Sequence, residues 1–502
     1  MIAGVFASPA GAVALPALGA LAISLCGRAP NLREAVTLLT AALLFALVTG
    51  ILPGVLAGEF PHVVLLDTLP GLALELRVEP LGMLFALVAS GLWIVNSIYS
   101  IGYMRANGEA HQTRFYVCFA IALAATMGVA FAGNLLTLFL FYEILTLSTY
   151  PLVTHHGTLE ARRAGRVYLG VLLGTSIGFL LLAIAWTWSI SGTLSFERGG
   201  ILSEETGPAL TGALLALYVF GIGKAALMPF HRWLPAAMVA PTPVSALLHA
   251  VAVVKAGVFC VVKVIVYVFG TEFLLRSGSA IWLPAVAGTT IVLASVIALR
   301  ADNLKRRLAY STVGQLSYVV LAAALLAPAS VMAAALHIGA HAVSKITLFF
   351  AAGAIYTAAH KTLVSELDGI GRRMPLTMTA FAIGALSMIG VPPTAGFVSK
   401  WYLLSGAMTT GQFAAVAVIV VSTLLNAAYF LPIVYRAFFL APAGSAHGEA
   451  SAGHGHGASG AKLGHGEAPW PMLLALWVTA GLTLLLFFAP GPLLQLAARI
   501  GG

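Results

Sequence analysis

Residues 221–257, GIGKAALMPFHRWLPAAMVAPTPVSALLHAVAVVKAG, decide the fold of this chain. Lys224, His249 and Lys255 lie in a largely apolar stretch, and four prolines stand between the two lysines. Proline inside a helix removes a backbone hydrogen bond and kinks or breaks the helix. Broken backbone is tolerated at membrane depth only where protein or a wet cavity covers it. The stretch therefore predicts an interrupted membrane helix with ionisable groups in its interior.

The composition places the whole chain in a membrane. Of 502 residues, 60% are hydrophobic and only 9% are charged, whereas a soluble domain carries about 25% charged residues. A membrane-spanning helix needs about 20 mostly apolar residues. We expect an all-α polytopic membrane protein with about fourteen spans. They are placed at residues 4–26, 35–57, 80–103, 115–132, 134–154, 167–190, 209–229, 242–269, 280–300, 308–327, 330–358, 376–405, 412–440 and 471–497.

The distribution of basic residues predicts the orientation of the spans. The first apolar run has no basic residue before it, so we expect a retained span rather than a cleaved signal peptide. Loops on one side hold 17 Lys and Arg, and the opposite loops with the C-terminal end hold only Arg77, Arg198, Arg276 and Arg499. Basic loops stay in the cytoplasm. We therefore expect a multi-pass protein of the inner (plasma) membrane with both termini outside. Its net charge of +9 reflects this orientation, and we expect no nucleic-acid partner.

Six charged residues lie inside the expected spans, apart from Arg300 and Arg436, which are counted with the basic loops at the span ends. They are Glu143, Lys224, Lys255, Lys263, Lys345 and Lys400. An ionisable group at mid-membrane costs at least about 2.5–3.5 kcal/mol on insertion scales, and such groups usually mark ion or proton pathways. Lysine exchanges its proton more readily than arginine when buried. Lys263 and Lys224 lie near span ends, where a lysine can also extend to the membrane interface.

Three histidines extend this set of ionisable groups. His337 and His341 are spaced by four, and Lys345 follows after another four, which places all three on one helical stripe. His249 and Lys255 are six apart, on different faces of one helix unless that helix is locally irregular. Together with water, these groups are typical of a proton path.

The two proline-rich interruptions suggest an internal repeat. MIGVPPTAGFVSK, residues 388–400, breaks a second span and ends at Lys400. Two interrupted spans, each with its own lysine, are typical of transporters built from inverted repeats. We expect two inverted five-helix repeats, at residues 111–270 and 271–440. A three-helix segment at 1–110, a linker at 441–469 and a last span at 470–502 complete the predicted organisation.

The sequence gives no clear sign of a metal or cofactor site. Cys26, Cys118 and Cys260 lie far apart without a C-x-x-C pair, so we expect packing residues and no zinc or iron–sulfur site. The Gly-, Ser- and His-rich stretch at 447–467 is expected to be a solvated linker. Metal binding by its histidines stays open as the alternative.

Five motifs resemble one family of membrane proteins. They are FYEILTLSTY (141–150), GKAALMPFHRWLPAAMVAPTPVSALLHAVAVVKAG (223–257), LKRRLAYSTVGQLSY (304–318), HAVSKITLFF (341–350) and GVPPTAGFVSKW (390–401). In this order they resemble the antiporter-like subunits of Mrp-type cation/proton antiporters, respiratory complex I and membrane-bound hydrogenases. The resemblance covers nearly the whole chain.

The resemblance implies roles for the buried charges. Glu143 would pair with Lys224, Lys255 would be the relay lysine with His249 beside it, and Lys400 would occupy the charged position of the second broken span. His337, His341 and Lys345 would continue the polar axis. Some members carry a glutamate where this chain has Lys400. That difference and the chain length favour the D-type component of Mrp antiporters or a hydrogenase relative, while the proximal complex I subunit stays open.

The implied function is proton translocation within a hetero-oligomeric membrane complex. The first candidate is a component of a cation/proton antiporter, with Na⁺ as the expected second ion. A proton-pumping module of an NADH–quinone oxidoreductase or hydrogenase is the second, and an energising component of inorganic-carbon uptake is the third. A solitary organic-solute symporter is the weakest candidate. No quinone, flavin, haem or iron–sulfur motif is present, so any redox chemistry would belong to partner subunits.

Overall fold

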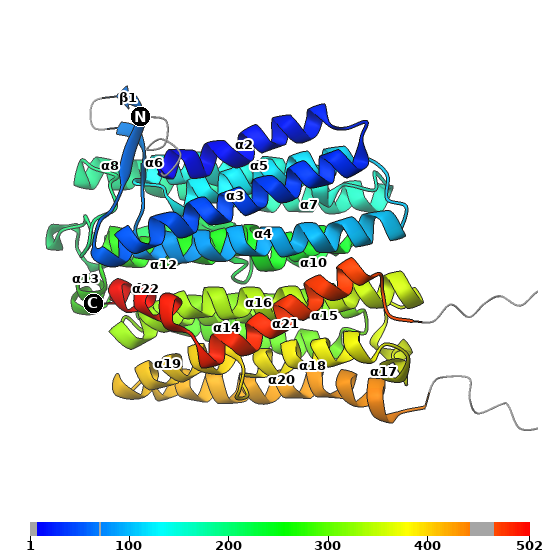
Figure 1. Cartoon of the computed structure of the whole chain (residues 1–502). Coiled ribbons are helices and arrows are strands. Elements are labelled where there is room, and N and C mark those ends of the chain that lie inside the picture. The colour runs from blue at the N-terminus through cyan, green and yellow to red at the C-terminus, as the bar shows by residue number, and fades with distance from the viewer. Residues whose placement is uncertain (1–7, 70–71, 442–465, 502) are drawn as a thin grey trace, which may run out of the picture.

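The chain folds into one elongated bundle of helices that run side by side along a common direction (Figure 1). This computed structural model describes residues 8–69, 72–441 and 466–501. The histidines His447, His454, His456 and His465, considered above as metal ligands, lie outside the described residues.

The order of the helices along the chain follows the apolar runs of the sequence. The first three spans are α2 (Pro9–Leu25), α3 (Pro30–Ala57) and α4 (Pro80–Ala106). They are followed by α5 (Gln112–Ala130), α6 (Leu135–Val153), α7 (Leu159–Thr175) continued by η1 (Ser176–Leu180) and α8 (Leu181–Ser191), α9 (Pro208–Gly221), and α11 (Thr242–Ala246) continued by η5 (Leu247–Val251), α12 (Val253–Val264) and η6 (Ile265–Phe269). The second half holds α14 (Leu283–Arg300), α15 (Leu304–Ala324), α16 (Pro328–Ala359), α18 (Pro375–Ile389), α19 (Ala395–Thr409), α20 (Phe413–Phe439), α21 (Trp470–Phe488) and α22 (Gly491–Gly501).

The fold class predicted from the sequence is confirmed. Among the described residues, ten helices are long and apolar enough to cross a membrane, and α2, α9 and α18 are shorter apolar helices. Two of these three, α9 and α18, are short because each ends at an interruption. With α15, which carries basic residues at its start, they make up the expected set of about fourteen spans. The exact boundaries of the two repeats stay a prediction.

One element is not expected in an all-helical chain. Strands β1 (His62–Leu69) and β2 (Leu72–Arg77) pair antiparallel at one end of the bundle (Figure 1). The stretch LELR alternates apolar and charged residues, which is the period of a half-buried strand, but between the expected spans 35–57 and 80–103 we expected only a loop. Leu76 is fully buried, and Asn134 Nδ2 donates to the carbonyl of Ala73 at 2.7 Å. The hairpin is thus attached to the bundle, and its end is called the hairpin side below.

Both interrupted helices depend on glycine at close approaches. After α9, the chain turns through η3 (Gly223–Ala225), and a Cβ on Gly257 of α12 would lie 2.3 Å from the carbonyl carbon of Lys224 in η3. In the second interruption, a Cβ on Gly396 would lie 1.9 Å from the carbonyl oxygen of Ser387. Real Cβ atoms do not approach backbone so closely, so glycine is required at both contacts.

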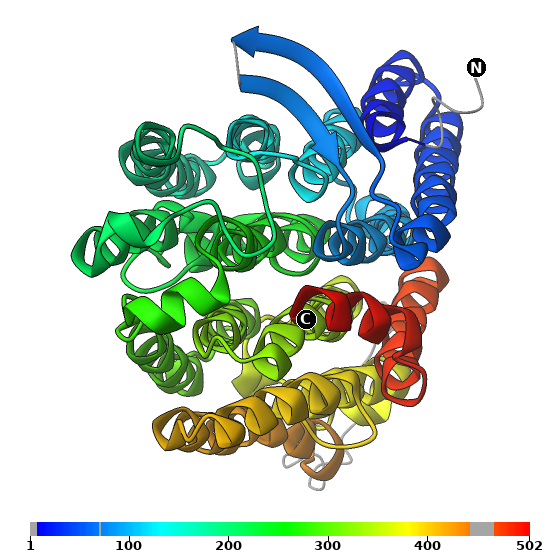
Figure 2. The ribbon, with the colours of Figure 1, turned by 90° about the vertical axis from the view of Figure 1, so that its left-hand side faces the viewer.

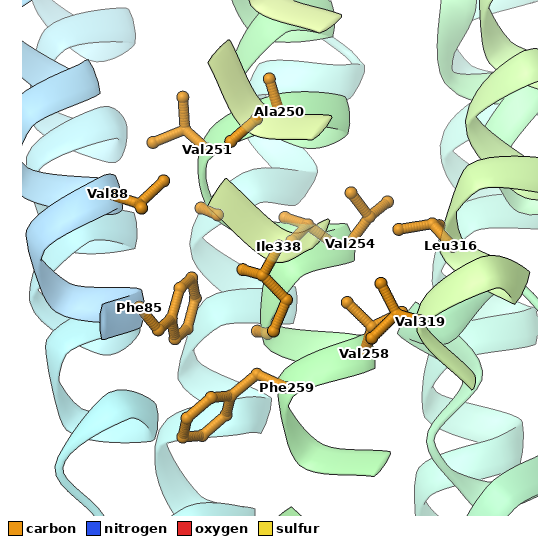
Figure 3. Packing of buried hydrophobic residues seen from close by; sticks show 14 of the residues in the cluster. Phe85, Val88, Ala250, Val251, Val254, Val258, Phe259, Leu316, Val319 and Ile338 are labelled. Carbon is orange, nitrogen blue, oxygen red and sulfur yellow. The ribbon is translucent and has the colours of Figure 1, made fainter. Parts of the chain in front are cut away.

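Two long helices form the centre of the bundle. The segment 242–269 and helix α16 are buried along their whole apolar windows. Figure 3 shows Val254 and Val258 of α12 and Ile338 of α16 packed between α4 and α15. Seen from the hairpin side, the two halves of the chain lie above and below this centre (Figure 2). Ionisable groups on these two helices therefore face protein rather than lipid.

The end of the linker is anchored to the bundle. Glu467 Oε1 accepts hydrogen bonds from the backbone nitrogens of Leu376, at 2.6 Å, and Thr377, at 3.2 Å. A carboxylate at a helix N-terminus satisfies free N–H groups and complements the helix dipole. The stretch 447–467 is therefore not solvated linker throughout, because Glu467 caps α18.

We predict that Gly257→Ala strongly lowers the amount of folded protein. The added methyl group would collide with the backbone of η3, which cannot move without displacing Lys224. Gly174→Ala is the matched control, because nothing lies within 4 Å of a Cβ built there and its helix conformation accepts alanine. Fluorescence size-exclusion chromatography of the solubilised variants measures the folded fraction. Equal profiles for both variants would contradict the close approach.

Candidate functional site

Lys224 lies in the first interruption and is fully buried. Its Nζ donates to the carbonyl of Tyr142 at 2.9 Å and to Thr146 Oγ1 at 2.5 Å, both on α6. Nζ also lies 3.1 Å from the centroid of the Tyr142 ring. Helix α6 therefore holds the ammonium group with neutral oxygens and an aromatic face.

Glu143 does not make the direct ion pair with Lys224 that we expected. Tyr142 and Thr146 are four residues apart and share one face of α6, whereas Glu143 is turned by about 100° from Tyr142. Both Glu143 carboxylate oxygens are buried and have no hydrogen-bond partner among the described residues. Glu143 thus follows Tyr142 directly in the sequence, but its carboxylate makes no hydrogen bond to the groups that hold Lys224. Its role in proton transfer stays a prediction.

Lys255 contacts the histidine stripe across the centre of the bundle. Its Nζ is hydrogen-bonded to Nδ1 of His341 on α16. The rings of His341 and His337 stack with their centroids 6.0 Å apart and their planes within 7°. His337 and His341 therefore lie on one face, as their spacing predicts.

His337 connects this stripe to the second interrupted helix. Its Nδ1 lies 2.8 Å from Ser399 Oγ on α19, and its Nε2 lies 3.0 Å from Gln315 Oε1 on α15. Gln315 Nε2 in turn donates to the carbonyl of Met388 at 3.4 Å. Both imidazole nitrogens of His337 thus have polar partners, which fixes the ring orientation. Sequence reasoning missed Gln315 and Ser399, because neither residue is charged.

Lys400 completes this row of groups. Its Nζ donates to the carbonyls of Met388, at 2.8 Å, and Ile389, at 2.9 Å, in the last turn of α18. The final carbonyls of a helix have no partner inside it and carry partial negative charge. The second interruption therefore exposes the oxygens that hold Lys400. We call Lys255, His341, His337, Ser399 and Lys400 the polar axis.

Two of the expected residues lie beside the polar axis. Lys345 Nζ donates to Ser311 Oγ at 2.9 Å, and Tyr429 Oη donates to the same Ser311 oxygen at 3.0 Å. His249 lies in the π-helical segment η5, so the helix between His249 and Lys255 is locally irregular, the alternative that their spacing left open. Its ring packs 4.8 Å from the Phe349 ring, and neither nitrogen has a hydrogen-bond partner in the described part of the chain. His249 and Lys345 are buried, and neither is hydrogen-bonded to a residue of the axis in the described part of the chain.

Lys263 has a carboxylate partner that was not expected from the sequence. It is fully buried, so it does not extend to the lipid interface. Its Nζ lies 3.2 Å from Glu79 Oε2 and donates to the carbonyl of Ala132 at 2.7 Å. Glu79 precedes Pro80 at the start of α4, outside the expected spans. A lysine inside an apolar helix needs such a partner, and this was the signal available from the sequence.

The residues present offer few metal ligands. No group of three or more His, Cys, Asp or Glu side chains is placed to hold an ion in residues 8–69, 72–441 and 466–501. The chemistry that this arrangement supports is the movement of protons between nitrogens and oxygens.

A helical membrane bundle with buried lysines and histidines in a row belongs to the class of ion-translocating membrane proteins. The family model described as "NADH:quinone oxidoreductase/Mrp antiporter, TM" matches residues 132–426. The chain belongs to this family. The match begins just before α6 and ends within α20, so it includes the whole polar axis.

Curated relatives include components of two kinds of complex. NADH-quinone oxidoreductase subunit N of Desulforudis audaxviator is 36% identical over 375 residues, which is 74% of this chain and 74% of the relative. The A/B component of a probable K(+)/H(+) antiporter of Rhizobium meliloti is 33% identical over 73% of this chain and 36% of the relative. The A1 component of a Na(+)/H(+) antiporter of Staphylococcus aureus is 32% identical over 68% of this chain and 44% of the relative. The chain thus spans less than half of these two antiporter components.

Two solved structures share the fold over nearly the whole chain. The Mrp complex from Dietzia sp. contains a chain with a TM-score of 0.85 at 23% identity, covering 99% of this chain and 97% of that one. The archaeal membrane-bound sulfane sulfur reductase contains one with a TM-score of 0.84 at 25% identity, covering 98% and 96%.

We predict that Lys400→Glu destabilises the protein, although some family members carry glutamate in this region. The carboxylate would face the carbonyl oxygens of Met388 and Ile389, which then lose their donor; leaving a buried charge unpaired costs about 3–5 kcal/mol. Lys361→Glu is the control, because Lys361 also donates to a carbonyl, that of Glu366, at an exposed site. Thermal unfolding in detergent measures the effect. A Lys400→Glu midpoint equal to that of Lys361→Glu would contradict this prediction.

Proposed function

We propose that this chain is a proton-translocating membrane subunit of a multisubunit cation/proton antiporter, with Na⁺ as the exchanged cation. The observation that carries the proposal is a row of buried polar groups. Lys255 is hydrogen-bonded to His341, His341 stacks on His337, and His337 contacts Gln315, which shares the Met388 carbonyl with Lys400. The helices that carry Lys255 and His341 are buried along their whole apolar windows. The relatives named as parts of Na(+)/H(+) and K(+)/H(+) antiporters support the exchange reaction.

The geometry suggests how protons move along the axis. Lys255 and His341 share a hydrogen bond, so a proton can pass between the amine and the imidazole without a large movement. An imidazole can accept a proton on one nitrogen and release one from the other. His337 holds partners on both nitrogens, so it relays toward Ser399 and Gln315 beside Lys400.

Lys224 is the proposed switch at the other end of the axis. Gly257 lies on α12, two residues after Lys255, and allows the backbone of Lys224 to pack directly against this helix. A displacement of η3 would therefore shift α12 near Lys255. It would also move Lys224 relative to the Tyr142 and Thr146 oxygens that hold it. Glu143 lies beside those oxygens without a hydrogen-bond partner in the described residues and is the proposed carboxylate that responds to the charge on Lys224.

A proton-pumping module of a redox complex is the second candidate. Its support is the 36% identity to NADH-quinone oxidoreductase subunit N, of which this chain covers 74%. The 25% identical chain of the sulfane sulfur reductase, a respiratory membrane complex, agrees with it. In either case we propose that other membrane subunits are the partners and that the chain acts in the cell membrane with both ends outside. The basic residues on one side of the predicted topology support this orientation.

We predict that Lys224→Arg abolishes transport without preventing assembly. An arginine can still interact with Tyr142 and Thr146, but it does not release its proton near neutral pH. Proton flux in inverted vesicles that contain the whole complex should fall at least tenfold. Lys361→Arg, at an exposed site, should transport normally. If Lys224→Arg transports at the wild-type rate, the charge of Lys224 is structural and the proposed switch is wrong.

We also predict that Glu143→Gln lowers proton flux at least tenfold at normal expression. The substitution keeps the shape of a side chain whose oxygens have no hydrogen-bond partner in the described structure, so folding should be unaffected. Glu160→Gln, in the first turn of α7 outside the polar axis, is the control. Normal flux for Glu143→Gln would show that the carboxylate takes no part in the transfer.

A further inference from the structure

The ion pair of Glu79 and Lys263 lies at the hairpin side and has no place in the axis described above. Lys263 is completely buried and Glu79 is 6% exposed. The pair joins α4 to α12, and Ala132 supplies the second acceptor for Lys263. The ring of Phe196 lies 4.3 Å from Lys263 Nζ and covers the pair.

A cavity leads to this ion pair from the hairpin side. Its volume is about 340 Å³, and its lining includes Glu79, Arg77, Glu197, Arg198 and Tyr267. Glu197 and Arg198 are exposed, so the cavity is continuous with the surface at its rim. Polar side chains and this volume are sufficient for several water molecules. Glu79 is thus a buried carboxylate in the wall of a cavity that reaches solvent.

An aromatic contact separates the ion pair from the polar axis. Lys263 and Lys255 lie eight residues apart on α12, a rise of about 12 Å along the helix. The Phe259 ring lies between them in sequence, 5.6 Å from Lys263 Nζ, and packs against Phe85 of α4 with ring centroids 5.0 Å apart. Figure 3 shows these two rings beside Val258 in the packed centre. The cavity is therefore closed toward Lys255 by apolar side chains.

We propose that Glu79 and Lys263 form an ionisable gate through which protons pass between the solvent on the hairpin side and the polar axis. This inference rests on the proposed function. Glu79 takes a proton from water in the cavity, which breaks the ion pair. The Lys263 ammonium, now without its counter-charge, gives its proton to the Lys255 amine through water admitted when Phe259 moves. The Glu79 proton then returns to Lys263 and restores the pair, so one proton crosses in each cycle.

Other titratable groups lie around the gate. Arg77 comes from β2, Glu197 and Arg198 from the segment before η2 (Glu204–Thr206), and Tyr267 from η6; Cys260 lies one turn from Lys263 on α12. Glu197 shares the cavity with Glu79 but is exposed and makes no ion pair within residues 8–69, 72–441 and 466–501. It therefore provides a matched carboxylate for the test.

The experiment separates a gate from a structural ion pair. Glu79→Gln, Lys263→Gln and the double variant Glu79→Gln/Lys263→Gln are compared with Glu197→Gln in vesicles that contain the whole complex. Removing one partner leaves a buried charge and can destabilise the protein, but the double variant leaves none. We expect the double variant to assemble normally and to lose proton flux at least tenfold, while Glu197→Gln keeps it. Normal flux in the assembled double variant would overturn the gate and leave only a structural pair.

A second measurement keeps the result separate from the proposed function. Lys255→Met removes the axis lysine and should also abolish flux. If Lys255→Met is inactive while the double gate variant is active, the gate is wrong and the axis stands. If both are active, the proposed function itself fails. If the double variant fails to assemble, Phe259→Trp, which enlarges the aromatic seal, should slow the flux of the assembled complex at least tenfold, and an unchanged rate would overturn the gate.

Discussion

The hydrogen bond between Lys255 and His341 joins the two helices on which the rest of the molecule depends. Each helix is buried along its apolar window, so neither residue can reach lipid or bulk water. An ionisable group in such a place is stable only when polar atoms replace water around it. The surrounding bundle supplies those atoms through side chains such as Ser399 and through carbonyls freed at the helix interruptions.

This requirement explains the second helix interruption, between α18 and α19. An intact helix uses its carbonyls internally, whereas an interrupted helix leaves its last carbonyls free. Lys400 takes two of these, those of Met388 and Ile389. Lys224 lies in the other interruption but is held by a neighbouring intact helix, through the Tyr142 carbonyl and Thr146. The two lysines are thus related by sequence pattern but held in different ways, and they need not serve the same step.

The sequence predicted the features that depend on periodicity and composition. A spacing of four residues predicted that His337 and His341 share one helix face. The prolines and glycines predicted the positions of both interruptions. Contacts between distant segments were not predictable in this way. Glu143 follows Tyr142 in the sequence, but helical rotation turns it by about 100° from the face of α6 that holds Lys224, and its oxygens have no hydrogen-bond partner in the described residues. Glu79 resembles a loop residue because nothing local indicates that α12 brings Lys263 to it. The hairpin was missed because its short strands stand in an otherwise all-helical pattern.

The partners of the five buried lysines divide them into two kinds. Lys224, Lys255, Lys345 and Lys400 are held by carbonyls, hydroxyls or an imidazole, and the described residues place no carboxylate within ion-pair distance of them. Lys263 alone among them is paired with a carboxylate. A neutral acceptor binds an ammonium group without fixing its charge, whereas a carboxylate favours the charged form strongly. A lysine paired in this way changes its charge only after its partner is protonated, and Glu79 is the partner that borders a cavity open to solvent. The four lysines with neutral partners are suited to repeated proton transfer inside the bundle. The paired lysine, Lys263, is suited to controlling the access of protons from the hairpin side.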